Sequence, residues 1–326
     1  MNRIIRGMRL GIITCLGLGV LSCSGGSDTS PRFLSVGTAP PGGAFFVVGG
    51  AIAQVVDQHS EAGWQVSSEA TKGTQENIRR LAKDELDFAL ANAAISYFAV
   101  RGEGNWDGKQ AIRTVMTLAP NVALFIAPKS SDVKLLADLK GKRVVVGPAG
   151  AGFDYFLKPI LAAHGVNYDD FSPLNNTQAG SVDMLADGSA AAAFLGGAVP
   201  TASITQAAAS QDIHFIPFTD TAKTSLFADY PFFSAATIPV NTYRGQTEAF
   251  AGMNVGNMHL ITRASLDDET VYAFTKLLYS NRSEVVKKHP AGRAINPKNI
   301  IRDTGTPFHP GAIKYFKEIG IWPTAK

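Results

Sequence analysis

The chain has 326 residues, of which 45% are hydrophobic and 17% charged, so it can bury the core of one large domain or two ordinary ones. Its formal net charge is +3, but Arg3, Arg6 and Arg9 lie at the N-terminus, and without them 27 basic residues face 27 acidic ones. A body with no excess of basic charge lacks the electrostatic signature of nucleic-acid binding, so we expect no nucleic-acid partner.

The first 23 residues have the pattern of a targeting segment. Three arginines precede an apolar run from Leu10 to Leu21, which is too short to span a bilayer. The run ends at Cys23 and a polar Ser-Gly-Gly-Ser stretch, which resembles a bacterial lipoprotein signal in which Cys23 is lipidated. Such signals prefer Leu at the position of Val20, so the alternative is a plain secretory signal with an incidental cysteine. We expect a signal peptide over 1–23, a flexible tether over 24–32, and a periplasmic protein held at the membrane by a lipid anchor.

The stretch that follows organises the rest of the chain. Residues 34–36 read as the end of a strand, and a turn rich in Pro and Gly runs from Thr38 to Gly43. Phe45, Val48, Ile52 and Val55 then recur at helical spacing. The first N–H groups of such a helix have no partner within the helix, and together with the helix dipole they favour an anion. For a single segment of this kind, the alternative interpretation is an ordinary strand–loop–helix turn that binds no ligand.

The same arrangement recurs along the chain. A strand over 64–69 leads through a Gly-containing turn to a helix over 75–82, for which we expect Thr74 to be the N-cap. A strand over 142–146 opens into a second Gly-rich loop, and a helix follows in which Pro159 predicts a kink or a late start. The other expected elements are strands over 86–90, 122–127, 190–195, 232–238 and 253–262, and helices over 130–141, 177–187, 200–209, 268–279 and 311–320.

The two halves of this pattern resemble each other. Residues 81–91 and 185–195 both run from a helix end through a polar corner into a buried strand that ends in small residues. We therefore expect an α/β protein of two similar lobes, with a ligand cleft at the carboxyl ends of their strands. Crossings near 117–121 and 251–256 would form a hinge. The expected lobes are 33–120 plus 255–326, and 121–254.

The usual catalytic constellations are missing from the sequence. There is no G-x-S-x-G or Walker motif, and Gly147, Gly150 and Gly152 have the wrong order for a dinucleotide fingerprint. The histidines lack metal-ligand spacing. His309 beside Pro310 suits a turn, and Asp154 is read either as a base or, preferably, as a partner of its helix dipole. We expect no catalytic residue, no metal and no cofactor, and the Gly-rich loops 38–43, 71–74 and 150–154 instead favour capture of a small anion outside the cytoplasm.

These loops resemble the TAXI family, the solute-binding receptors of tripartite ATP-independent periplasmic (TRAP) transporters. The resemblance spans about 33–322 and is most specific at Gly42-Gly43-Ala-Phe-Phe-Val-Val-Gly49, at Thr71-Lys-Gly73-Thr-Gln-Glu-Asn77 and at His309-Pro-Gly-Ala-Ile-Lys-Tyr-Phe-Lys-Glu-Ile-Gly320. Asp138-Leu-Lys-Gly-Lys142 is shared with bilobed receptors more broadly. The family implies a class II-like, two-lobed receptor that closes on a small organic acid and delivers it to a membrane permease.

Departures from the family pattern change the expected ligand. Phe45 and Phe46 replace two tyrosines, Ala94 replaces an aspartate, and Phe153 replaces a threonine. A ligand ammonium would lack its carboxylate partner, and an unpaired buried charge costs about 3–5 kcal/mol. We predict a carboxylate without an α-amino group, with an apolar or aromatic body against the phenylalanines, backbone donors and threonine hydroxyls on its carboxylate, and Lys72 as an added charge. The expected ligand-binding residues are Thr38, Gly42, Gly43, Phe45, Phe46, Thr71, Lys72, Gly73, Thr74, Asn92, Ala94, Gly150, Ala151, Gly152, Phe153 and Gly197.

Two other functions fit the same sequence. A bilobed extracytoplasmic enzyme could use Asp154 as a base, and turnover of a bound acid would reveal it. A sensory lipoprotein could present its ligand-bound form to a signalling protein, and unchanged uptake in a deletion strain would reveal that.

Overall fold

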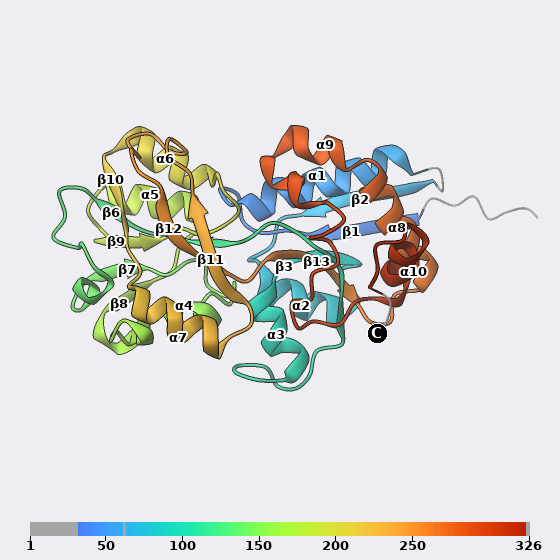
Figure 1. Cartoon of the computed structure of the whole chain (residues 1–326), viewed down its shortest axis with the longest axis horizontal. Coiled ribbons are helices and arrows are strands. Elements are labelled where there is room, and N and C mark those ends of the chain that lie inside the picture. Colours follow the sequence, from blue (N-terminus) through green and yellow to red (C-terminus); the bar gives the residue numbers. More distant parts are fainter. Residues whose placement is uncertain (1–31, 61–62, 324–326) are drawn as a thin grey trace, which may run out of the picture. The chain divides into compact units, whose positions relative to one another are not determined.

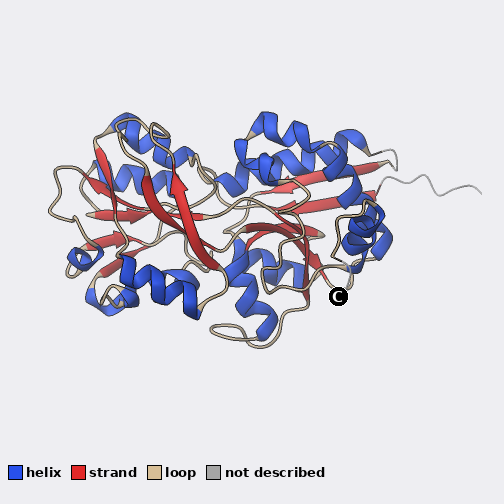
Figure 2. Cartoon of the chain, in the orientation of Figure 1, coloured by secondary structure: helices blue, strands red, loops and turns tan. Residues whose placement is uncertain are grey.

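The structure is a computed structural model that describes residues 32–60 and 63–323, which belong to one compact unit, Pro31–Lys326. The expected signal peptide and Cys23 lie outside the described residues. The expected tether overlaps them only at Arg32, which is the first residue of strand β1. The strands form two five-stranded sheets and one three-stranded sheet, with helices packed around them (Figures 1 and 2).

The first five-stranded sheet has the order β2-β1-β3-β13-β4. Strand β1 pairs in parallel with β2 and β3, and β13 pairs antiparallel with β3 and β4. The strands are β1 (Arg32–Gly37), β2 (Trp64–Glu69), β3 (Phe88–Asn92), β4 (Ile112–Thr117) and β13 (Met258–Arg263).

The second five-stranded sheet repeats this topology. Its order is β8-β7-β9-β6-β10, with β7 parallel to β8 and β9, and β6 antiparallel to β9 and β10. The strands are β6 (Phe125–Pro128), β7 (Arg143–Val145), β8 (Ser172–Leu174), β9 (Ala192–Phe194) and β10 (Ile213–Ile216). The predicted likeness of the two halves is therefore confirmed at the level of strand order and direction.

The chain passes between the two sheets twice. It leaves the first sheet after β4 and returns to it at β13, and between these points β5 (Val122–Ala123), β11 (Phe233–Ile238) and β12 (Phe250–Val255) form the antiparallel three-stranded sheet. The lobe boundaries at 120/121 and 254/255 stay a prediction.

Helices cover both faces of the first sheet. In Figure 1, α1 lies on one side of β1 and β3, while α2 and α3 lie on the other. Side chains of β3 alternate accordingly, because Phe88 and Leu90 belong to the core on the α1 side, and Ala89 and Ala91 to the core on the α2 side. The helices are α1 (Ala44–His59), α2 (Thr74–Ala82), α3 (Ala93–Arg101), α4 (Asp154–Ala163), α5 (Gln178–Ala186), α6 (Ala202–Ser210), α7 (Asp220–Asp229), α8 (Asp268–Ser280), α9 (Arg282–Lys288) and α10 (Pro310–Glu318).

Several predicted elements differ from the structure. The expected strand over 122–127 divides at Leu124, and the one over 253–262 divides at Gly256 and Asn257, because each apolar run continues while the chain changes sheets. Helix α4 contains Pro159 and begins without delay at Asp154, so a late start was the wrong expectation. The missed helices and strands are α3, α7, α9, β4, β8 and β10, and Leu136–Leu139 is only a short 3-10 helix.

Candidate functional site

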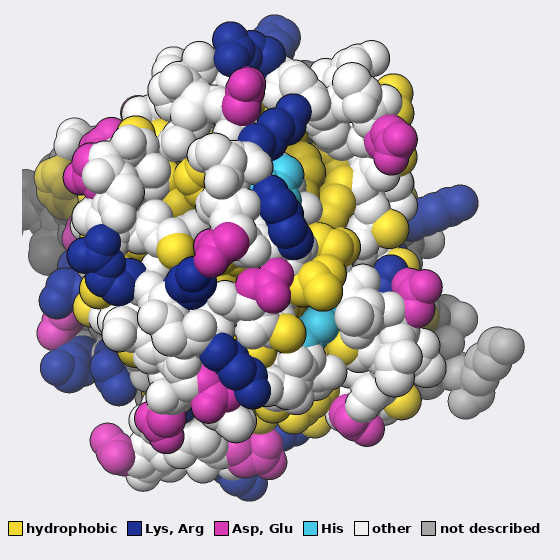
Figure 3. All heavy atoms as spheres, turned by 90° about the vertical axis from the view of Figure 1, so that its left-hand side faces the viewer, with side chains coloured by type: hydrophobic (Ala, Val, Ile, Leu, Met, Phe, Trp, Pro, Cys, Tyr) yellow, Lys and Arg dark blue, Asp and Glu magenta, His cyan; other side chains and the backbone are white. Residues whose placement is uncertain are grey.

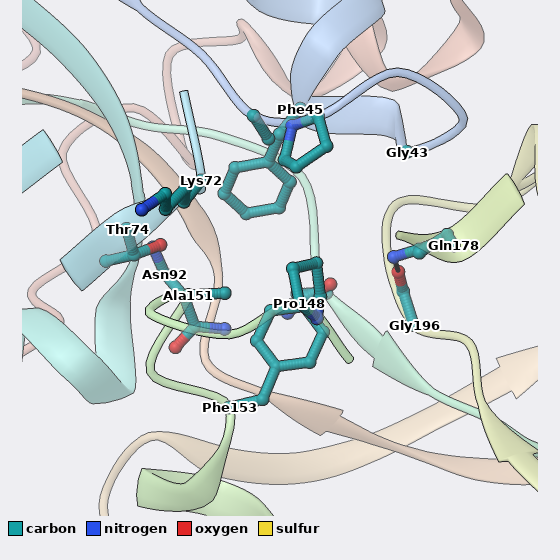
Figure 4. A pocket seen from close by; sticks show the side chains of 14 residues that line it. Gly43, Phe45, Lys72, Thr74, Asn92, Pro148, Ala151, Phe153, Gln178 and Gly196 are labelled. Atoms are coloured by element: carbon teal, nitrogen blue, oxygen red, sulfur yellow. Dashed lines mark hydrogen bonds between the residues drawn. The ribbon is translucent and has the colours of Figure 1, made fainter. Parts of the chain in front are cut away.

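A pocket lies where the three expected loops converge, at the carboxyl ends of parallel strands from both five-stranded sheets (Figure 4). It encloses about 500 Å³ of space outside the protein atoms, including space open to solvent. Its lining residues are Ala39, Pro40, Gly43, Phe45, Lys72, Gly73, Thr74, Asn92, Asn121, Pro148, Ala151, Phe153, Gln178 and Gly196.

Two helices that begin at the pocket have a glycine as N-cap. Gly43 is the N-cap of α1 and Gly73 that of α2, and neither has a side chain to accept from the first N–H groups. Side chains cap α3, α5, α7, α8 and α10, whereas α4, α6 and α9 also lack a side-chain cap. Within the described residues, the backbone N–H groups of Ala44, Phe45 and Thr74 donate to no protein acceptor. The uncapped helix ends therefore leave backbone donors and positive dipole ends at the pocket.

The N-cap predicted at Thr74 is wrong by one residue. Thr74 is the first residue of α2, and its hydroxyl accepts the N–H of Asn92 at 3.0 Å. That bond ties the start of α2 to the end of β3 and leaves the hydroxyl hydrogen for another acceptor.

The other two expected threonine hydroxyls are engaged by the backbone. Thr38 Oγ1 donates to the carbonyl of Glu69 at 2.8 Å, and Thr71 Oγ1 donates to the carbonyl of Thr38 at 3.1 Å and accepts the N–H of Gly73 at 3.1 Å. These bonds join the loops that follow β1 and β2. Thr38 and Thr71 thus shape the pocket from behind its lining.

The glycines of the three loops lie where two segments approach closely. Gly73, at φ +112°, would place a Cβ 3.4 Å from that of Ala151, and Gly42, at φ +96°, would place one 3.1 Å from the nitrogen of Ala179. A backbone hydrogen bond of 3.3 Å from Gln75 to the carbonyl of Ala151 joins the first pair of segments, and one of 3.3 Å from Ser203, in α6, to the carbonyl of Gly42 adds a further contact to the second loop. Glycine here serves contact between loops as well as access to a ligand.

Six of the expected ligand residues, apart from those threonines, lie outside the pocket lining. Ala94 is fully buried, and its N–H donates to the side chain of Asn92. Phe46 is 37% exposed on α1, one residue beyond Phe45. The remaining four, Gly42, Gly150, Gly152 and Gly197, flank lining residues.

The pocket is mainly apolar and has one charged side chain. Phe45 and Phe153 project into it beside Pro148, and the Lys72 ammonium is turned away from the two rings (Figure 4). No carboxylate lines it. The electrostatic environment consists of helix ends and one exposed lysine, which suits an anion better than a cation.

Sequence reasoning missed six lining residues. Ala39 and Pro40 lie inside the predicted loop 38–43, whereas Asn121, Pro148, Gln178 and Gly196 come from other segments. Gln178 donates to the carbonyl of Gly196 at 2.6 Å (Figure 4). It also accepts from Ser203 at 2.9 Å. Gln178 begins α5 directly after the N-cap Thr177, and Gly196 follows β9. The available signal was that both residues lie in segments that follow a strand, β8 and β9 respectively.

Three titratable residues outside the pocket, His259, His309 and Asp154, have contacts or positions that serve the fold. Burial lowers the pKa of His259 to about 3, and Ser96 lies 2.8 Å from its Nε2. His309 caps α10 by accepting the N–H of Gly311 at 3.2 Å, which confirms the predicted turn. Asp154 is in the first turn of α4, as its dipole role requires. Among the described residues, no cluster of His, Cys, Asp and Glu could hold a metal ion.

The side of the molecule that bears β10 shows no uniform charge. Lys and Arg side chains alternate there with Asp and Glu (Figure 3). A second, wider hollow is lined by residues that include His214, Phe215 and Arg244, and Arg244 lies 3.7 Å from Asp212. Separately, none of the described helices has both the length and the apolar character needed to cross a membrane.

The repeated sheet topology, the double crossing and the pocket at the strand ends define the fold of a two-lobed periplasmic binding protein. A protein from Bordetella bronchiseptica RB50 has this fold in common at 16% identity, with a TM-score of 0.53 and 90% of each chain covered. The chain belongs to the NMT1-like family, whose model matches residues 36–320.

Two further solved structures are similar at lower scores. The periplasmic aliphatic sulphonate binding protein SsuA from Escherichia coli is 15% identical over 90% of this chain and 84% of its own, with a TM-score of 0.49. The alkanesulfonate-binding protein SsuA from Xanthomonas axonopodis, bound to MOPS, is 14% identical over 90% and 81%, with a TM-score of 0.48.

Proposed function

We propose that this protein is a periplasmic solute-binding receptor of the TAXI type, which captures a small organic acid and delivers it to a TRAP-type membrane permease. The observation that carries the proposal is the pair of uncapped helix N-termini, α1 and α2, at one pocket that contains no carboxylate. Free N–H groups and dipole ends stabilise an anion there, and no carboxylate of the lining repels it. The family membership and the specific motifs at 42–49, 71–77 and 309–320 support the same proposal.

The chemistry of the lining favours an acid that lacks an amino group. An ammonium would need an acidic or several carbonyl partners, and the lining supplies no acidic side chain. Phe45, Phe153 and Pro148 provide apolar surface for the body of the ligand. The lipid anchor on Cys23 and the permease partner rest on the sequence and its resemblance.

Native mass spectrometry of gently purified protein tests capture directly, because a retained small acid appears as a fixed mass increment. Calorimetric titration with glutamate, oxoglutarate and an aromatic acid then tests the preference, and tight binding of glutamate alone would refute the amine argument. Turnover of the bound acid would favour an enzyme instead. Loss of uptake on deletion of the gene, with binding intact in the purified protein, supports transport over sensing.

A further inference from the structure

Asn121 is a buried residue whose side-chain amide is open to the pocket. The residue is only 5% exposed, yet it lines the pocket. Its backbone is fixed, since its N–H donates to Oδ1 of Asn254 at 3.0 Å and its carbonyl accepts the N–H of Val255 at 2.9 Å. Within the described residues, its side-chain amide has no protein hydrogen-bond partner.

The other buried amides of the lining are already engaged. Asn92 accepts from the N–H of Ala94 and donates to the carbonyls of Val255 and Gly256. Gln178 is bound at both ends by Gly196 and Ser203. Asn121 therefore differs from its neighbours in having both its donor and its acceptor available to the pocket. Because this amide has no protein partner and is not among the fully enclosed polar atoms, it is open to the pocket and can pair with a bound molecule.

The chemistry of the amide indicates what that partner is. Backbone donors at α1 and α2 supply the sites for a carboxylate, which only accepts hydrogen bonds. An amide can in addition accept from a hydroxyl at Oδ1, or donate to a carbonyl oxygen from Nδ2. We propose that Asn121 is a specificity-determining residue that binds a hydroxyl or carbonyl oxygen of the ligand, so that the receptor selects hydroxy or oxo acids over acids without that oxygen. This inference rests on the proposed function.

The test uses three series of acids that differ by one oxygen: propionate, lactate and pyruvate; succinate, malate and oxaloacetate; phenylpropionate, phenyllactate and phenylpyruvate. Calorimetric titration of the full-length protein gives the affinity ratio within each series. We expect the oxygenated member of the best-bound series to bind about tenfold more tightly, because the unoxygenated acid leaves the amide unpaired. In Asn121→Ala this ratio falls to about one, while the affinity for the unoxygenated acid is retained.

Two further variants separate specificity from a structural effect. Asn121→Asp keeps an acceptor and loses the donor, so it lowers the affinity for all acids but retains a preference only for the hydroxy member. Asn257→Ala is the matched control, because Asn257 is similarly buried and does not line the pocket. Its side chain binds the carbonyl of Leu118 and the amide of Asn254, which in turn holds the N–H of Asn121, so this variant disturbs the backbone support of Asn121 and keeps its side chain. It is expected to leave the ratio unchanged, and thermal unfolding of each variant checks the fold.

The outcomes distinguish the two proposals. Equal binding of all three members by the wild type, or an equal loss for all of them in Asn121→Ala, overturns the role of Asn121 and leaves the receptor proposal standing. If the wild type binds no acid in any series, the receptor proposal fails and this inference falls with it.

Discussion

Asn92→Ala should destabilise the protein more than the loss of an ordinary helix cap does. The side chain of Asn92 accepts the N–H of Ala94 at 2.8 Å, and this cap contributes about 1 kcal/mol. Its amide also donates to the carbonyls of Val255 and Gly256, both at 3.1 Å, where the chain returns from β12 to β13. Each of these bonds contributes about 0.5–1.5 kcal/mol, so the expected loss in the free energy of unfolding is about 2–4 kcal/mol.

Urea denaturation of the purified variants measures this loss, with Thr177→Ala as the matched control. Thr177 caps α5 through a single bond to the N–H of Gly180 and touches no crossing segment, so its removal should cost about 1 kcal/mol. Asn92→Ser keeps a capping oxygen and loses the reach to Val255 and Gly256, and should fall between the two. If Asn92→Ala costs no more than Thr177→Ala, the bonds to the crossing segment contribute nothing and the reasoning is wrong.

Three other predictions follow from single residues. Gly256→Ala should lower the free energy of unfolding by about 2–4 kcal/mol, because φ is +102° and the new Cβ would lie 2.6 Å from the nitrogen of Ala94; Gly188→Ala, at φ +76° with open space around it, is the control for urea denaturation. Lys72→Met should weaken binding of the retained acid about threefold at low ionic strength and less at high salt, because salt screens the charge. Calorimetric titration of the variant and the wild type measures this, and the same affinity ratio at low and at high salt would contradict it. His259 is buried with a pKa of about 3 against an ordinary 6.5, so the stability from its neutral form is complete above about pH 6.5 and is lost as the pH falls toward 3. Unfolding between these limits should therefore be less pH-dependent in His259→Gln, by about 1.4 kcal/mol per pH unit.

The sequence predicted the elements with strong periodicity and missed those that depend on tertiary context. The strand over 64–69 and the helix α1 have the predicted pattern because their apolar residues repeat over a long enough span. Helix α3 was missed because its start depends on Asn92, a residue read as the end of a strand. The sequence did not predict that the strands expected over 122–127 and 253–262 are each divided in two. Both runs stay apolar while the chain passes from one sheet to another.

The pocket was predictable in outline and not in its polar details. The three loops were predicted from their glycine content and their position after strands, and residues of all three line the same pocket. The threonines illustrate the limit, because Thr38, Thr71 and Thr74 look alike in sequence and only Thr74 lines the pocket. Which hydroxyl or amide is engaged by a backbone carbonyl depends on distances between residues far apart in the chain. Asn121 has no local signal at all beyond its position in a crossing.

The donors at the start of α2 connect ligand binding with the contact between the two sheets' loops. The N–H of Gln75 donates to the carbonyl of Ala151, which belongs to the loop after β7, while Thr74, one residue earlier, lines the pocket and its N–H has no acceptor among the described residues. An anion held by the N–H of Thr74 lies beside the loop whose carbonyl, that of Ala151, accepts from the N–H of Gln75. Any movement that separates these loops breaks the bond from Gln75 and exposes the anion to water at the same time. Binding of an anion at α2 and approach of the loop after β7 therefore favour each other, as a receptor that encloses its ligand requires.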